Sequence, residues 1–335
     1  MSVLRSFATA VLVVSTGSCS SGRVPEAAAP IDSVIEPAVI VRPESSAPVV
    51  LVTIDGVRWQ DVYSRVDYMP TLNAMARDDG AFVGADERAA MRASGPNYVS
   101  LPGYTEILVG RRSSTCRDNE CARTRIPTLL DRAAEAGLSV AAFASWEKLD
   151  RAITARPGQF VVSAGREPGD RSSPAPGSGE YRPDAKTAEV ALEYLEIVQP
   201  DVFYLGLGDP DEHAHHGDFD GYKGSLAQAD DVLARLRRVL DRMGPRGKAT
   251  HVFVTADHGR SHDFRSHGGA APESARVWFV GTGPRIVARG RSTSPHERHL
   301  ADVAPTIATV IGVEPPRAPG SGEVLNELFE SKTTL

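Results

Sequence analysis

The sequence has no excess of positive charge, because 37 Lys and Arg residues are outnumbered by 43 Asp and Glu residues, a formal net charge of −6. Proteins that bind nucleic acids in general are basic, so this balance argues against that class. The sequence also shows no internal repeat. Its 41% hydrophobic and 24% charged residues are ordinary for a globular protein, and 335 residues suffice for one large α/β domain or two smaller ones.

Cysteine is scarce, with three residues in the whole chain. Cys116 and Cys121 are five positions apart, and a metal site of the C-x4-C kind would need a second cysteine pair that the sequence does not contain. In an exported protein, two cysteines at this spacing can close a short disulfide loop. We therefore predict a Cys116–Cys121 disulfide.

The N-terminal apolar run is shorter than a transmembrane helix requires. Residues 1–19 contain one arginine, then the apolar run, then small residues, which is the layout of an export signal. Cys19 stands where a bacterial lipoprotein carries its lipid anchor, although Thr16 replaces the usual aliphatic residue, so lipidated and unlipidated export both stay open. Residues 20–47 are rich in Ala, Pro, Ser and Glu and are expected to form a disordered tether. The protein is thus expected in the periplasm or attached to the cell envelope, with a single folded domain at 48–335.

Apolar runs alternate with helical patterns over most of that domain. The run at 48–54 is typical of a central parallel strand that is buried on both faces. Such alternation predicts an α/β fold with a mostly parallel sheet covered on both faces. The segment 166–182 is rich in Gly, Pro and Ser and is expected to be a surface loop. Further strands are expected at 138–145, 201–206, 251–255 and 275–281, and helices at 69–77, 101–110, 126–137, 184–198, 222–243 and from 300.

Three of the expected strands are followed by aspartates. Asp55 follows the first strand, Asp209 and Asp211 follow the strand at 201–206, and Asp257 follows the strand at 251–255. One such aspartate often caps the next helix. Several of them, with histidines nearby, indicate a common site, because ligands in open α/β sheets gather at the carboxyl ends of the strands.

Histidines accompany two of these aspartates. Asp211 and His215 are four residues apart, so on a helical turn they face the same ion, while Asp209 is the alternative if the turn is irregular. Asp257 and His258 offer a hard oxygen and an imidazole nitrogen, which suits zinc and similar divalent ions. His262 and His267 follow this pair a few residues later.

Ser100 precedes a Pro-Gly segment that opens an apolar helical run. The start of a helix favours phosphate and other tetrahedral anions, although a plain N-cap serine is the alternative. A serine oxygen bound to a metal becomes accessible as an alkoxide near neutral pH. Ser100 is therefore the candidate nucleophile, and Asn97 and Tyr104 are candidate partners for the substrate's non-bridging oxygens.

In their order, these motifs resemble the alkaline phosphatase superfamily, especially its nucleotide pyrophosphatase/phosphodiesterase branch, over about residues 49–312. The resemblance implies a three-layer α/β/α sandwich with two divalent ions, usually zinc. It further implies the following sets of ligands: Asp211, His215 and His267 for one ion, and Asp55, Asp257, His258 and the Ser100 oxygen for the other. His262 is the rival to His267 as the last ligand.

The activity implied by the resemblance is hydrolysis of phosphate monoesters or diesters through a phosphoseryl intermediate on Ser100. Sulfatases share the layout, but their nucleophile lies in a C/S-x-P-x-R context, and Tyr104 stands here where that motif has arginine. A sulfatase or phosphonate hydrolase on the same fold remains one alternative. A non-catalytic envelope binding protein is another.

Overall fold

The computed structural model describes residues 46–112, 115–165, 181–292, 294 and 296–329. The predicted export signal, Cys19 with its possible lipid anchor and nearly all of the predicted tether lie outside these residues, as does most of the predicted surface loop at 166–182. Among the helices of the described residues, none has the length and apolar character that a membrane span requires.

The centre of the fold is an eight-stranded sheet in the order β10-β2-β9-β7-β1-β6-β4-β5. β1 pairs in parallel with both β6 and β7, whereas β9 pairs antiparallel with β2 and β7. The sheet is therefore mostly parallel, as predicted. Its strands are β1 (Val49–Ile54), β2 (Gly80–Val83), β4 (Val140–Ala144), β5 (Val161–Ala164), β6 (Val202–Leu207), β7 (His251–Thr255), β9 (Phe279–Thr282) and β10 (Gly290–Arg291).

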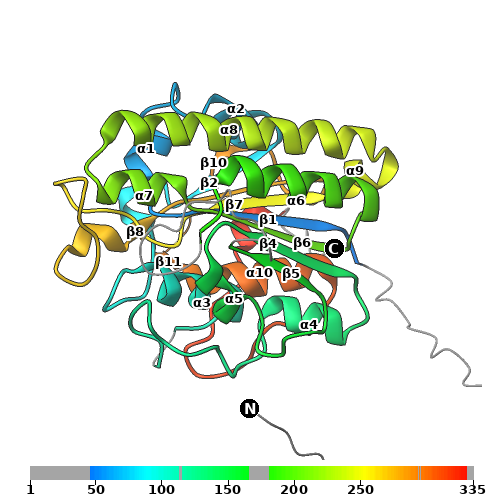
Figure 1. The fold of residues 1–335 in the computed structure, drawn as a ribbon. Helices are drawn as coiled ribbons and strands as arrows, with labels where there is room; N and C mark the ends of the chain where they lie inside the picture. Colours follow the sequence, from blue (N-terminus) through cyan, green and yellow to red (C-terminus); the bar gives the residue numbers. More distant parts are fainter. Residues whose placement is uncertain (1–45, 113–114, 166–180, 293, 295, 330–335) are drawn as a thin grey trace, which may run out of the picture. The chain divides into compact units, whose positions relative to one another are not determined.

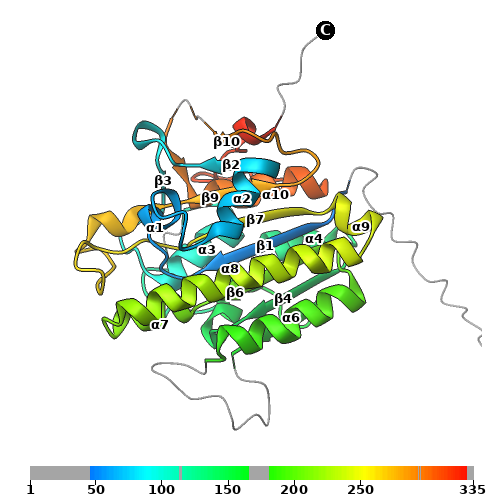
Figure 2. The same ribbon diagram turned by 90° about the horizontal axis from the view of Figure 1, so that it is seen from above.

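Helices cover both faces of this sheet (Figure 1). Every residue of β1 is buried, and its side chains alternate between the two faces, with Val50 and Val52 in one hydrophobic cluster and Val49 and Leu51 in the other. One face carries α2 (Pro70–Asp79), α6 (Asp184–Val198), α8 (Phe219–Arg242) and α9 (Pro245–Ala249), as Figure 2 shows from above. The other face carries α3 (Ser100–Val109), α4 (Leu129–Glu135), α5 (Asp150–Ile153) and α10 (Val303–Ile311). The predicted three-layer α/β/α sandwich is confirmed.

Some element boundaries differ from the prediction for local reasons. The strand expected at 275–281 is divided into β8 (Arg276–Val277) and β9, and β8 joins a small second sheet with β3 (Met91–Arg92) and β11 (Arg298–His299). The helix expected at 126–137 begins later, because Thr128 and Asp131 form a capping box at its start. β2 and β10 were not predicted, since they are short and each begins with glycine.

Parallel pairing brings three strand ends to the same edge of the sheet. β1 lies between β6 and β7, and the register pairs Ile54 with Leu207 and Thr53 with Thr255. Asp55 and Asp257 therefore leave neighbouring strands side by side. The segment after β6 continues into α7 (Asp209–His215), which carries the third aspartate to this edge.

Candidate metal and nucleophile site

The ends of β1 and β7 bring Asp55, Asp257 and His258 together. The His258 Nε2 atom lies 3.4 Å from Asp55 Oδ1 and 3.4 Å from Asp257 Oδ2, and all three residues are buried. The Gly56 N–H donates to Asp257 Oδ1 at 3.1 Å. A predicted set of ligands that are separated by two hundred positions in the chain is thus adjacent in space.

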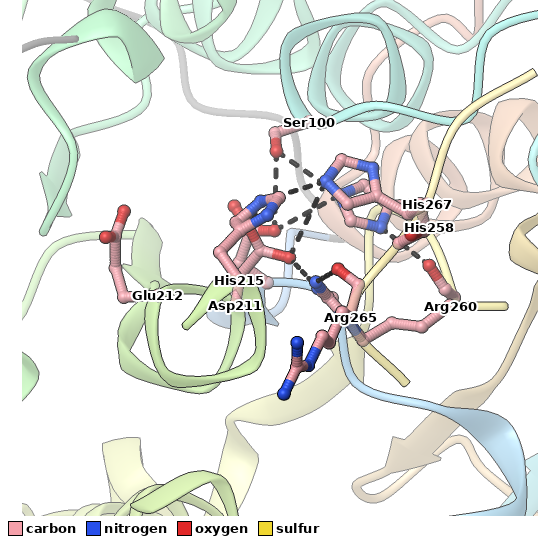
Figure 3. A network of polar contacts seen from close by, with 12 residues as sticks. Ser100, Asp211, Glu212, His215, His258, Arg260, Arg265 and His267 are labelled. Carbon is pink, nitrogen blue, oxygen red and sulfur yellow. Dashed lines mark hydrogen bonds and ion pairs between the residues drawn. The ribbon is translucent and has the colours of Figure 1, made fainter. Parts of the chain in front are cut away.

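α7 and the loop after β7 supply a second group of residues. His215 Nε2 lies 2.9 Å from Asp211 Oδ2, one helical turn away. His267 Nε2 lies 3.1 Å from His215 Nε2 and 4.0 Å from Asp211 Oδ1. The three side chains point toward one another and toward His258 in Figure 3.

The two groups meet at His258. Oxygen and nitrogen atoms within 4.8 Å of one another come from Asp55, Asp257 and His258 in one set and from Asp211, His258 and His267 in the other. The rings of His258 and His267 stack with centroids 4.0 Å apart. His258 therefore lies between the two predicted ion positions, whereas the resemblance assigned it to one of them alone.

Backbone carbonyls determine which nitrogen of each imidazole faces the site. His258 Nδ1 lies 2.8 Å from the Gly259 carbonyl, and His267 Nδ1 lies 3.0 Å from the Tyr98 carbonyl. Because a carbonyl oxygen can only accept a hydrogen bond, Nδ1 must carry the proton in both rings, which leaves an Nε2 lone pair directed at the carboxylates. This is the orientation that metal-ligating histidines adopt.

The buried carboxylates of the site have shifted pKa values. Burial, together with the charges of Asp257 and Asp211, raises the pKa of Asp55 well above its ordinary value. Burial and the charge of Asp211 likewise raise the pKa of Asp257. Burial also acts to raise the pKa of Asp211, but Arg260 and His215 outweigh it, and that pKa falls well below its ordinary value.

The donor set fits divalent cations. Asp257 Oδ2 is buried and has no hydrogen-bond partner among the described residues. A buried carboxylate oxygen without a partner is costly unless a cation or donor satisfies it. Oxygen and imidazole ligands of this kind are those that zinc and similar ions prefer.

Ser100 is the first residue of α3, and its side chain faces this group. Ser100 Oγ lies 3.2 Å from His258 Nε2 and 3.4 Å from Asp55 Oδ1, and the residue is 4% exposed. Gly103 allows this approach, because a Cβ atom there would lie 2.3 Å from the Asp257 carbonyl oxygen. The first turn of α3 therefore packs directly on the end of β7.

The structure shows which residue of each alternative pair, Asp209 or Asp211 and His262 or His267, lies beside the other predicted ligands. Asp209 accepts a hydrogen bond from the Tyr181 hydroxyl at 2.6 Å and is not part of either group. The His262 side chain is 84% exposed and pairs with Glu273. It is Asp211 and His267 that lie beside the other predicted ligands.

The two predicted substrate partners differ in position. Tyr104 is buried, and its hydroxyl donates to Asp55 Oδ2 at 3.1 Å. Asn97 donates to the Arg117 carbonyl and lines a small separate space. Ser100 lines a cavity of about 480 Å³. The residues that line it are Asp55, Ser100, Tyr104, Asn119, Trp146, Leu149, Tyr181, Leu207, Gly208, Asp211, Glu212, His215 and His216.

Sequence reasoning missed Asn119 and Arg260. Asn119 Oδ1 accepts the Leu101 N–H at 2.9 Å, which places its amide beside the start of α3. The available sequence signal was the position of Asn119 between Cys116 and Cys121. In the structure, the Cα atoms of these cysteines lie 5.2 Å apart and their sulfur atoms are paired. Arg260 directly follows the Asp257-His258-Gly259 motif, and its side chain pairs with Asp211.

Comparisons with known proteins agree with this geometry. A family model described as the metalloenzyme superfamily matches residues 171–315, which include Asp211 and Asp257. The 2,3-bisphosphoglycerate-independent phosphoglycerate mutase of Natronomonas pharaonis is 34% identical over 148 residues, covering 42% of this chain and 26% of the mutase. The same enzyme of Haloarcula marismortui is 32% identical over 133 residues, covering 39% of this chain and 24% of the mutase. The chain thus matches about a quarter of the length of these curated relatives.

Solved structures extend the likeness to most of the fold. A 2-O GAG sulfatase has a TM-score of 0.63 at 14% identity and covers 84% of this chain and 74% of its own. The phosphonate monoester hydrolase of Agrobacterium radiobacter has a TM-score of 0.61 at 16% identity and covers 86% of this chain and 78% of its own. These comparisons do not single out the nucleotide pyrophosphatase/phosphodiesterase branch. The solved structures show that the chain has an alkaline phosphatase-like fold, and the family model shows that residues 171–315 resemble the metalloenzyme superfamily.

Proposed function

We propose that this protein is a metal-dependent hydrolase of phosphate esters with Ser100 as its nucleophile. Residues 171–315 match the metalloenzyme superfamily, whose members are metal-dependent enzymes of phosphoryl or sulfuryl transfer. The observation that carries the proposal is the position of Ser100 Oγ, buried at the start of α3 and within 3.4 Å of both Asp55 and His258. A hydroxyl there is placed both for attack and for interaction with bound cations.

We propose that two divalent ions, preferably zinc, occupy the site. Asp211, His215 and His267 would hold one ion, and the following would hold the other: Asp55, Asp257, His258 and the Ser100 oxygen. When bound, such ions supply Lewis acidity and neutralise the negative charge that develops on the phosphoryl group.

The residues of the chain itself then account for the covalent steps. Ser100 Oγ attacks phosphorus, forming an Oγ–P bond as the P–O bond to the leaving alcohol breaks. Water next attacks the phosphoseryl group, releasing the phosphate product and restoring the Ser100 hydroxyl. The N-terminus of α3 favours the negative charge on the transferred group. The Asn119 side chain amide, whose oxygen is engaged by the Leu101 N–H, presents its NH₂ group as a donor to a non-bridging oxygen.

Part of the cavity lining favours an apolar or aromatic ester group. Trp146, Leu149 and Leu207 line the same cavity as Ser100 and the charged residues, and Trp146 is joined to Tyr181 by an antiparallel β-bridge. Aromatic side chains stack on planar groups and shield them from water. Aryl phosphates are therefore suitable first substrates.

A substrate panel tests the proposed reaction. Zinc-replete protein is given p-nitrophenyl phosphate, bis-p-nitrophenyl phosphate, p-nitrophenyl phenylphosphonate and p-nitrophenyl sulfate, and the release of nitrophenolate is measured. We expect one of the phosphates to be cleaved fastest, with activity lost in EDTA and restored by zinc. Faster cleavage of the sulfate or phosphonate would favour the alternative reaction on this fold. Zinc binding without cleavage of any compound would favour a binding protein.

Asn119→Ala tests whether the side-chain amide of Asn119, rather than that of Asn97 as predicted from the sequence, binds the substrate. We expect kcat/KM to fall about 10- to 100-fold, because one donor to the developing charge is lost. Asn97→Ala is the matched control and should stay within about threefold of wild type, because its amide is engaged by Arg117. Steady-state kinetics on the best phosphate measure both variants. The reverse ranking would restore Asn97 as the substrate partner.

We further propose that the protein is exported, with or without a lipid on Cys19. Export would place Cys116 and Cys121 in an oxidising compartment, where disulfides persist. Their Cα separation of 5.2 Å lies in the range that a disulfide requires. A closed loop there would hold Asn119 beside α3.

A further inference from the structure

Arg260 is a fully buried cation at the centre of the site. Its side chain has 0% exposure, and its Nη1 atom pairs with Asp211 Oδ1. Its Nε–H donates to the Phe264 carbonyl at 2.6 Å, and its Nη2 donates to the Arg265 carbonyl at 2.6 Å. One guanidinium thus contacts α7 and the loop after β7 at the same time (Figure 3).

The loop that Arg260 contacts carries His267. Phe264, within it, has a positive φ of 68°, which side-chain-bearing residues rarely adopt. Its ring packs edge-on against Phe219 at 5.1 Å and Tyr222 at 4.9 Å. The loop is therefore held from outside by aromatic packing and from inside by Arg260.

The chemistry of the contacts requires arginine in particular. A guanidinium presents several donors in a fixed planar fork, so it can bond a carboxylate and two carbonyls together. Lysine can replace the charge opposite Asp211, but its single nitrogen does not reproduce this planar arrangement. Removing the cation altogether leaves the buried Asp211 carboxylate without its closest charge partner.

We propose that Arg260 is a positioning residue, which holds Asp211 and the His267 loop in the arrangement that binds one of the two divalent ions. The inference rests on the proposed function only in taking Asp211 and His267 as ligands. Two effects oppose each other here, because the guanidinium orders the ligands but also repels a nearby cation. If ordering dominates, loss of Arg260 weakens ion binding. If repulsion dominates, its loss tightens ion binding.

Zinc titration of the EDTA-treated protein against a chromogenic chelator distinguishes these effects. We expect Arg260→Gln to weaken one of the two zinc sites by about 10- to 100-fold, as is usual for groups that orient metal ligands, and to leave the other within about threefold. Arg260→Lys should fall between Arg260→Gln and wild type. Arg265→Gln is the matched control, since Arg265 is exposed and only its carbonyl contacts Arg260. It should bind zinc as wild type does.

Unchanged or tighter zinc binding in Arg260→Gln would overturn the proposal, as would a wild-type protein that binds no zinc. Circular dichroism and thermal unfolding of each metal-free variant check folding, and if Arg260→Gln does not fold, Arg260→Lys decides by the same titration. Because the readout is binding, weaker zinc binding in Arg260→Gln than in a wild-type protein that cleaves none of the substrates would uphold this role while defeating the proposed reaction. Normal zinc binding with full activity in Arg260→Gln would do the opposite.

Discussion

Replacing Ser100 with alanine is expected to lower kcat for phosphate ester hydrolysis by about a thousandfold or more, because no covalent intermediate can form without the hydroxyl. Zinc binding should persist, since the Asp and His ligands are unchanged. Turnover of the best phosphate substrate and zinc content after desalting measure the two effects. Loss of activity with retained metal would identify Ser100 as the nucleophile.

Thr105→Val provides the control on the same helix. Thr105 is buried in α3, and its hydroxyl donates to the Leu101 carbonyl at 2.7 Å, one turn back along the helix. Removing that hydroxyl alters the helix without touching the reacting group, so activity should stay within about threefold of wild type. Full activity in Ser100→Ala would remove the proposed nucleophile. An equal loss in Thr105→Val would show that packing of α3 had been measured instead.

Asp257→Asn is expected to stabilise the metal-free protein and to reduce the stabilisation that zinc provides, because one of the two proposed ion sites loses a ligand. Without ions, the carboxylates of Asp55, Asp211 and Asp257 lie buried together. Burial and the charge of Asp211 both raise the pKa of Asp257. The amide removes one charge, and its nitrogen can donate to His258 Nε2, which lies 3.4 Å from Asp257 Oδ2. We expect a rise in Tm of about 2 °C or more for the metal-free variant at pH 7.5, and a loss of phosphate ester hydrolysis.

The same pKa shifts give the metal effect a pH dependence. For Asp55 and Asp257, the folded pKa is raised above the unfolded value of 3.8, chiefly by burial. Their contribution to stability is therefore fully present below that value and is lost as pH rises through the raised folded values. Metal-free wild type should lose stability over this window. Because zinc must displace the same protons, the increase in Tm on adding zinc should grow with pH.

Thermal unfolding with and without zinc, from pH 5 to pH 8, measures both effects. Asp241→Asn on α8 removes the same charge from an exposed position and should follow wild type throughout. In Asp257→Asn, the pH dependence of stability should flatten, and the increase in Tm on adding zinc should be smaller than in wild type. A metal-free Asp257→Asn protein less stable than wild type would contradict charge repulsion among the buried carboxylates, and undiminished stabilisation by zinc would exclude Asp257 as a ligand.

Much of this fold and of the candidate site could be predicted from local sequence patterns alone. The run of β1 before Asp55 is apolar except for Thr53, and such a run is typical of a strand buried on both faces. The spacing of Asp211 and His215 likewise places both on one side of a helical turn. Parallel strands whose ends carry aspartates then predict that these residues meet at one edge.

Tertiary structure decided what local pattern left open. Asp209 and Asp211 share a helix, and hydrogen bonds from the Tyr181 hydroxyl and the Asp184 N–H hold the Asp209 carboxylate away from the other ligands. His262 and His267 share a loop, and its course, held by Arg260, determines which of them faces Asp211. Asn119 lies in a loop between two cysteines, and this loop brings its side chain to the Leu101 N–H at the start of α3. Strand periodicity and helical spacing are properties of neighbouring residues and can be read from the chain, whereas the path of a loop depends on distant contacts that no local pattern encodes.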